Sequence, residues 1–425
     1  MKMKWKALLV ACAAGALGWT SPAWAEEREG DPLAGQRVLD RGALVRAVLE
    51  RNPDIHMMAL GADVARAKVG QAKAWMDPML RLEVAPLSLV SQHHRKGVVV
   101  GVEQTIPLFG RRGTEGERAR AEAEGAEADA DTMRLRMAQE ASSMFDDWYL
   151  VHRTVEVIDH HIHRMREVKR SAELQYGVGM GSQQDPLQAE VELARMERER
   201  LMLDAEKEMI RAQLNAMLRR DPDLPLPPPP SVLSDEGVAF GDRAALRAEA
   251  LQKRPELKAL RARLGGSEAM EKLARTSWLP EVGVMAEYNT MWDAPEHQVM
   301  AGVMINIPIQ TGMRRSMAEE ARADVARMRA EERARVNQIV AEVDVALARV
   351  SEARAALKLH GERLVPAARH QLAAARVAFE SGRREFMALM EAENNLHELR
   401  LGQHAAEAEL HRRIAQLNRA VGRLP

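Results

Sequence analysis

Two long runs of regularly spaced apolar residues constrain the fold of this chain more than any other feature. Their steps alternate mostly between four and three residues, a mean of about 3.5, which keeps one stripe of a helix against a partner helix. The first run consists of Ala130, Met133, Met137, Ala141, Met144, Trp148, Val151, Val155, Ile158, Ile162 and Met165. The second consists of Val336, Val340, Val343, Leu347, Val350, Leu357, Leu364, Ala368, Ala375 and Ala378. A single run of this kind would predict an ordinary coiled coil. Here, however, each of the two runs is preceded by segments with the alternating residue pattern of β-strands.

The amino-terminal residues 1–25 are predicted to be a secretory signal peptide. Three lysines precede an apolar stretch, and Ala23-Trp24-Ala25 has the small-residue pattern of a cleavage site. The stretch is too short for a transmembrane anchor. Leu9-Val10-Ala11-Cys12 also resembles a lipoprotein cleavage box, so lipidation of Cys12 is the alternative. Cleavage after Ala25 would leave a mature chain without cysteine, and its stability would depend on packing.

The first structural repeat is predicted over residues 26–220. Alternating apolar and polar residues predict strands over residues 79–90 and 97–106. A long helix is expected over residues 113–176, and glycines at 177, 179 and 181 end it. A further helix is expected over residues 186–220, with Asp185 as its N-cap and Pro186 in its first turn.

The pattern starts again after a proline-rich linker at residues 221–234, and the second repeat covers residues 235–425. Strands are predicted over residues 281–290 and 298–307, a long helix over residues 313–380 and a last helix over residues 386–421. Pro255, Pro280 and Pro308 repeat Pro53, Pro78 and Pro107 about 200 residues later. Each half is therefore predicted to contain, in order, a helix, a β-hairpin, a long helix, a turn and a further helix.

These lengths suit a membrane protein with a long extramembrane part. Strands of about ten residues can cross a bilayer when tilted. Four strands cannot close a barrel, and lipid does not tolerate an open sheet edge, so several copies would have to assemble. Helices of about 65 residues, at 1.5 Å per residue, would reach roughly 100 Å. Charged residues make up 29% of the chain and aromatic residues only 4%, which is typical of long solvated helices.

With its tandem repeat and two hairpins, the chain resembles the TolC-like outer membrane efflux protein (outer membrane factor) family over nearly all of its mature length. The segment Gln104-Thr105-Ile106-Pro107-Leu108-Phe109-Gly110-Arg111-Arg112-Gly113 is similar to the strand-to-helix junction of that family. The first helical tip is matched by Tyr176, Gly179, Ser182, Asp185, Leu187, Ala189 and Glu190. The second tip is matched by Phe379, Gly382, Ala392 and Glu393, but Glu385 and Ala388 stand where the first tip has Ser and Asp. The two tips therefore need not act alike.

The resemblance implies a mostly α fold with a membrane β part. Three chains would form a homotrimer with a twelve-stranded barrel in the outer membrane and a tunnel of helices in the periplasm. It also implies a periplasmic adaptor and an inner-membrane pump of the proton-driven RND type as partners, and a passive channel without a cofactor. The tip residues would constrict the periplasmic entrance and meet the adaptor, with Arg383 and Arg384 adding rings of charge. Arg81, Glu83, Glu103, Glu287 and Asn306 fall on polar strand faces, which would line a wet lumen.

Histidine and methionine are the residues that point to a substrate. His152, Glu156, His160 and His163 share one helix face, and within it only His160 and His163 have the close spacing of metal ligands. A solvated helix face rich in histidine is the simpler explanation. The abundant methionines are soft thioether ligands for Cu(I), although methionine is also a common core filler. They include Met133, Met137, Met144 and Met165 in the first apolar run and Met285, Met300 and Met304 on strands. Together these residues favour the heavy-metal branch, exporting copper and silver or zinc, cobalt and cadmium.

Other functions stay open on the sequence alone. The same duct could serve drug efflux or type I protein secretion, and the chain could also be a soluble periplasmic coiled-coil scaffold. The net charge of −1 does not indicate a nucleic-acid partner. No set of residues has the spacing of a catalytic site, so the sequence does not predict an enzyme.

Overall fold

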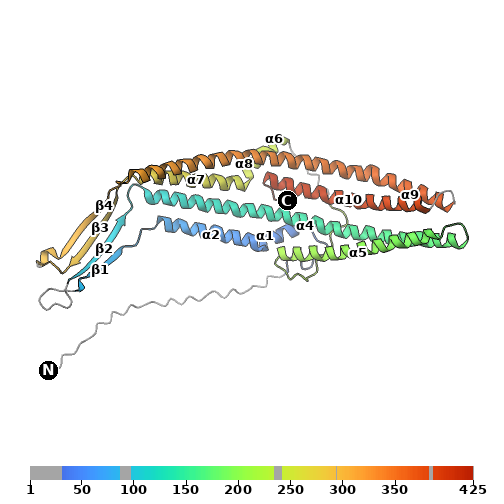
Figure 1. Cartoon of the computed structure of the whole chain (residues 1–425), viewed down its shortest axis with the longest axis horizontal. Helices are drawn as coiled ribbons and strands as arrows, with labels where there is room; N and C mark the ends of the chain where they lie inside the picture. Colours follow the sequence, from blue (N-terminus) through green and yellow to red (C-terminus); the bar gives the residue numbers. More distant parts are fainter. Residues whose placement is uncertain (1–30, 87–96, 234–241, 293, 382–385, 425) are drawn as a thin grey trace, which may run out of the picture.

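The computed structural model describes residues 31–86, 97–233, 242–292, 294–381 and 386–424. The predicted leader with Cys12 lies outside these residues, as do Gly382, Arg383, Arg384 and Glu385. The described part forms a long rod with a sheet at one end and the ends of two helix pairs at the other (Figure 1).

Four antiparallel strands form one sheet in the order β1-β2-β3-β4. They are β1 (Met79–Val84), β2 (Val98–Ile106), β3 (Glu281–Asn289) and β4 (Val299–Asn306), and a 3-10 turn η1 (Pro295–His297) precedes β4. The two predicted hairpins are thus joined through β2 and β3, with Val102 opposite Ala286. Strand β1 is shorter than predicted: the N–H of Ala85 still donates to Gly97, and then Pro86, which has no N–H, follows. The part of the predicted strand from residue 87 on is not described.

Helix α4 (Arg111–Gly177) runs from the sheet to the far end as one element of 67 residues. Its counterpart in the second repeat is helical over the predicted range, but it contains a π turn that the sequence did not predict. Helix α8 (Thr311–Leu359) passes through a π turn, η2 (His360–Leu364), into α9 (Val365–Glu380). Pro366 explains the interruption, because it cannot donate to the preceding turn and its ring crowds the carbonyl four residues earlier.

Shorter helices line the sheet-proximal half of the rod. They are α1 (Arg41–Arg51) and α2 (Pro53–Lys73) in the first repeat, and α6 (Arg243–Lys253) and α7 (Pro255–Thr276) in the second. A proline at the first position of α2 and of α7 separates each pair. Asn52 caps α2, accepting from the N–H groups of Asp54 and Ile55. In the far half, α5 (Gln184–Met217) returns along α4, and α10 (Phe386–Val421) returns along α9 (Figure 1).

Small residues let the helices approach closely, as the alanine-rich runs suggest. Gly125 of α4 lies against the backbone of Ala259 in α7, and Gly266 of α7 lies against Ala121. Toward the far half, α4 buries large side chains instead, including Phe145, Trp148 and Tyr149. The proline-rich linker packs across this part, because the indole of Trp148 donates to the carbonyl of Pro227 at 3.0 Å.

Within the described residues, no helix combines the length and the apolar character that crossing a membrane requires.

Candidate functional site

The sheet has one apolar face and one mixed polar face. Directly opposed residues share a face, so the ladder places Leu80, Val102, Ala286 and Ala301 on the first. The second face carries all five polar strand residues that the sequence singled out: Arg81, Glu83, Glu103, Glu287 and Asn306. A sheet with one apolar face and one polar face can separate lipid from water.

A charge pair crosses a whole strand on the polar face. Arg81 of β1 and Glu287 of β3 both lie opposite Gly101 of β2. Because Gly101 has no side chain, the guanidinium of Arg81 reaches the carboxylate of Glu287 at 2.5 Å. At the helix end of the sheet, Arg111 of α4 pairs with Glu281 of β3. Both pairs connect elements of different repeats.

Methionines are interleaved with these charges. Met285 lies opposite both Glu103 and Gly302, and Met304 lies opposite Gly283. Met300 lies opposite Glu287, so all three methionines share the polar face. The sequence placed them on strands, and the register brings them to the same side of one hairpin.

Exposed aromatic residues mark the ends of the sheet. Trp75, Phe109 and Trp278 lie near the junction with the helices, and Trp292 lies in the turn between β3 and β4. The guanidinium of Arg112 sits 4.6 Å from the ring of Trp75. Aromatic residues at such levels are typical of membrane interfaces.

The first helical tip is a tight turn between α4 and α5. Gly179 has φ +78°, a conformation that glycine adopts without strain. Ser182 closes the turn before α5: its hydroxyl accepts from the N–H of Gln184 at 3.2 Å, and Asp185 accepts from the N–H of Ser182 at 3.2 Å. The helix begins at Gln184, two residues earlier than expected, and Gln183 rather than the predicted Asp185 is its N-cap.

The other predicted tip residues take different places. Tyr176 is exposed at the end of α4, and Glu190 of α5 pairs with Lys169 of α4 at 3.5 Å. At the second tip, Phe379 is buried and packs edge-on against Phe386, with ring centroids 5.7 Å apart. Glu393 does not lie on the surface: it is buried and pairs with Arg164 of α4 at 2.8 Å. Burial raises the pKa of Glu393 against the pull of Arg164.

The predicted histidine face does not converge on a metal site. His160 is exposed, and His163 is exposed beside Glu167 at 3.5 Å. In the residues that the structure describes, no three His, Cys, Asp or Glu side chains lie together as metal ligands would. His161 points the other way and stacks on His397 of α10, with ring centroids 4.2 Å apart. Burial lowers the pKa of His161 to about 3 and that of His397 to about 4, so both rings are neutral at pH 7.

The family model for outer membrane efflux proteins matches residues 44–218 and 246–423, one match for each repeat. The chain belongs to this family. It is an efflux channel of the outer membrane that extends into the periplasm, which rules out a soluble periplasmic scaffold. A search of curated proteins found no match.

Solved channels share the fold of this efflux protein at low sequence identity. The outer-membrane channel OprN is 20% identical, with a TM-score of 0.77 over 92% of this chain and 95% of OprN. CusC, described as forming a transmembrane channel, is 17% identical, with a TM-score of 0.79 over 91% of this chain and 94% of CusC. The outer membrane protein VceC from Vibrio cholerae is 16% identical, with a TM-score of 0.75 over 90% of this chain and 96% of VceC.

Two features of this efflux channel were not predicted from the sequence: buried polar contacts made by α4, and a groove beside α7. Asp146 of α4 is fully buried and pairs with Arg41 of α1 at 2.5 Å, while burial raises the pKa of Asp146 to about 7. No local pattern marks Asp146, because its partner lies 105 residues away. Tyr149 likewise donates from α4 to Glu407 of α10 at 2.8 Å.

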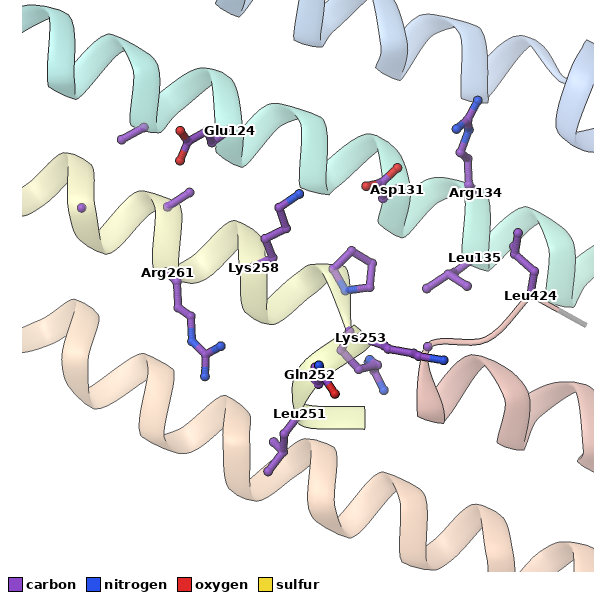
Figure 2. Close-up of a pocket in the computed structure, with 16 residues that line it drawn as sticks. Glu124, Asp131, Arg134, Leu135, Leu251, Gln252, Lys253, Lys258, Arg261 and Leu424 are labelled. Carbon is purple, nitrogen blue, oxygen red and sulfur yellow. The ribbon is translucent and has the colours of Figure 1, made fainter. Parts of the chain in front are cut away.

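The second feature is a groove of about 700 Å³ between α4 and α7, near the start of α7 (Figure 2). Lys258 points across it toward α4, where Glu124 and Asp131 lie, and Arg261 points away toward α8. Arg261 pairs there with Glu332 at 2.9 Å. The groove lies between elements of the two repeats, so the repeat pattern alone could not predict it.

Proposed function

We propose that this efflux channel is the exit duct of a tripartite system that exports heavy-metal ions. Three copies would close their sheets into one twelve-stranded barrel and their helices into one periplasmic tunnel. A periplasmic adaptor and a proton-driven inner-membrane pump of the RND type would complete the system. The channel would move ions passively, since the pump supplies the energy.

The two-faced sheet supports the closed barrel. Strands β1 and β4 are the edges of the sheet in one chain, and each carries backbone groups that lipid cannot satisfy. Pairing β1 of one copy with β4 of the next would satisfy those groups. The face with Arg81, Glu103 and Glu287 would then line the lumen, and the aliphatic face would meet lipid.

The methionines on the polar face are the observation that favours metal ions. A drug or peptide duct has no need of thioethers beside carboxylates in its lumen, whereas soft thioethers bind soft cations. Drug efflux or type I protein secretion is the alternative, since a polar lumen would also pass such substrates.

We further propose that the two helical turns form the periplasmic entrance. At the first turn, Tyr176 is exposed and available to an adaptor or to a neighbouring copy, whereas the exposed Glu190 already pairs with Lys169. Asp185 already accepts from the N–H of Ser182, so it would contribute to the shape of the turn more than to free charge.

Deletion of the gene tests the substrate class. We expect the deletion strain to lose tolerance to at least one of copper, silver, zinc, cobalt and cadmium, while its tolerance to hydrophobic drugs stays unchanged. A plasmid copy of the wild-type gene is the control and should restore growth. Unchanged metal tolerance, with loss of drug tolerance or of a secreted protein, would instead support the alternatives.

A further inference from the structure

We propose that Met285, Met300 and Met304 form a thioether site for a soft monovalent cation, Cu⁺ or Ag⁺, on the polar face of the sheet. This inference rests on the proposed function and narrows its substrate class. It separates copper and silver from zinc, cobalt and cadmium, because thioethers suit the former and Zn²⁺ prefers imidazole, thiolate and carboxylate.

The strand register places the three residues in neighbouring rows on one face of the sheet. Met285 of β3 lies opposite Gly302 of β4, and Met300 and Met304 flank Gly302 two residues away on either side. Residues two apart in a strand share a face. Diagonal neighbours across a ladder are about 7–8 Å apart at the backbone, which long side chains can bridge.

Two glycines leave room for the thioethers to lie flat on the sheet. A Cβ at Gly302 would stand 2.9 Å from the terminal methyl of Met285, so this side chain reaches across β4. A Cβ at Gly283 would stand 3.3 Å from the terminal methyl of Met304, so that side chain reaches back across β3. The two side chains therefore run in opposite directions through neighbouring rows, with Met300 beyond Met285.

The charges around the triad favour a cation. Glu103 of β2 lies directly opposite Met285, and no partner for its carboxylate is found among the described residues. Glu287 lies opposite Met300, but Arg81 already neutralises it. One free carboxylate beside neutral thioethers would balance the charge of one monovalent ion.

Core packing does not account for these methionines. Met304 is 37% exposed, and Met285 and Met300 are half-buried on the face that also carries the charges. Met137 and Met165 of α4, by contrast, are 4% and 0% exposed in the helical core, where methionine fills space.

The first hairpin carries no matching cluster in its described part. Its corresponding face has one methionine, Met79, beside Arg81 and Glu83. Met79 lies opposite Glu103, on the other side of that residue from Met285. Each chain would therefore hold one such site, built on the second hairpin.

Silver titration of the purified full-length protein tests the site. In detergent and chloride-free nitrate buffer, we expect calorimetry to show one Ag⁺ per chain, with Zn²⁺ unable to displace it. The variant M285L/M300L/M304L should weaken Ag⁺ binding by at least about tenfold. The matched control is M202L/M209L/M387L, which removes three exposed helix methionines and should bind as the wild type does. Should the triple strand variant fail to fold, the single variant Met300→Leu gives the same comparison, and Glu103→Gln should also weaken binding.

Wild-type protein that takes up no Ag⁺, or a strand variant that binds Ag⁺ as the wild type does, would overturn the site. The in vivo experiment is separate. If deletion leaves metal tolerance unchanged while the purified protein binds Ag⁺ through the triad, the site stands and the export function fails. If deletion abolishes silver tolerance but the strand variant both binds Ag⁺ and complements fully, the export function stands and the site fails.

Discussion

Gly101 is the residue that lets the first and third strands interact directly. Its missing side chain opens the path between Arg81 and Glu287, and a Cβ there would stand 3.4 Å from the Cβ of Glu287 and 3.8 Å from that of Arg81. The alternation of residues predicted which strand residues are polar. It could not predict this pair, since that required knowing that the second hairpin lies beside the first.

Replacing Gly101 with leucine is expected to separate this charge pair. The added side chain would fill the gap, leave Glu287 without its partner and destabilise the sheet by about 1–3 kcal/mol. Semi-native electrophoresis should show the folded form converting to the unfolded form at a lower temperature. Val100→Leu, on the apolar face of the same strand, is the control and should convert near the wild-type temperature. Equal conversion temperatures for Gly101→Leu and the wild type would show that the charge pair contributes nothing to the stability of the sheet.

The stacked pair of His161 and His397 predicts a pH dependence. Because their pKa values in the folded protein lie near 3 and 4, below the ordinary 6.5, the unfolded chain binds protons first as the pH falls. Their contribution is therefore present above pH 6.5 and is lost toward pH 4, by about 1–2 kcal/mol for each ring at pH 5.

Thermal unfolding at pH 7 and pH 5 measures this effect. Glu393 and Asp146, whose pKa values are raised, act in the opposite direction, so the comparison must be between variants rather than between pH values alone. We expect H161Q/H397Q to lose less of its melting temperature than the wild type between pH 7 and pH 5. An identical loss in both proteins would show that the imidazoles are not protonated on unfolding in this range.

Among the elements, the π turn between α8 and α9 differs most from the sequence prediction. The regular spacing suggested one uninterrupted helix, and Pro366 was the only warning. Ala353 and Val365 are both buried although they lie twelve residues apart, a separation that would put them about 120° apart around an α-helix. The π turn absorbs one residue and reduces the difference to about 20°, so the apolar stripe stays against its neighbours.

Deleting Gly361 tests this role of the π turn. Without the extra residue, Ala353 and Val365 would lie eleven residues apart, about 20° around a regular α-helix, so the stripe of α9 should stay in place without a π turn. Limited proteolysis should then cut α9 and α10 no faster than in the wild type. Gly361→Ala, which keeps the residue count, is the control, since a Cβ there would meet only Gln403 at 3.8 Å. Much faster cleavage of the deletion variant would mean that the π turn does not serve to absorb one extra residue.

At the first tip, local hydrogen bonds start the helix earlier than the sequence predicted. The sequence placed the helix start at Asp185-Pro186, but the hydroxyl of Ser182 already satisfies an N–H group of the first turn. Ser182→Ala should destabilise this turn by about 1 kcal/mol, measured as faster amide hydrogen exchange at the start of α5. The control is Ser381→Ala at the other tip, where the hydroxyl donates to the carbonyl of Ala378, and it should leave exchange in α5 unchanged. Unaltered exchange in Ser182→Ala would show that this hydroxyl does not stabilise the start of α5.

On the scale of the whole molecule, most of the fold could be predicted from the duplicated sequence pattern. Hairpins, long helices and returning helices were predictable because each half repeats proline and glycine residues at the same element boundaries. Contacts between distant segments were not, and these include Arg41 with Asp146, His161 with His397 and the groove beside Lys258. Such contacts join residues far apart in the chain, where the spacing of residues in one sequence gives no information.

Both edge strands of the sheet belong to the same chain, and this has a genetic consequence. If β1 of each copy must pair with β4 of the next, a copy with a damaged edge spoils every ring that it enters. In a ring of three copies, equal expression of a damaged and an intact allele would leave only about one ring in eight made entirely of intact subunits. An edge mutation in this gene should therefore behave as dominant, even in a cell that still carries a normal copy.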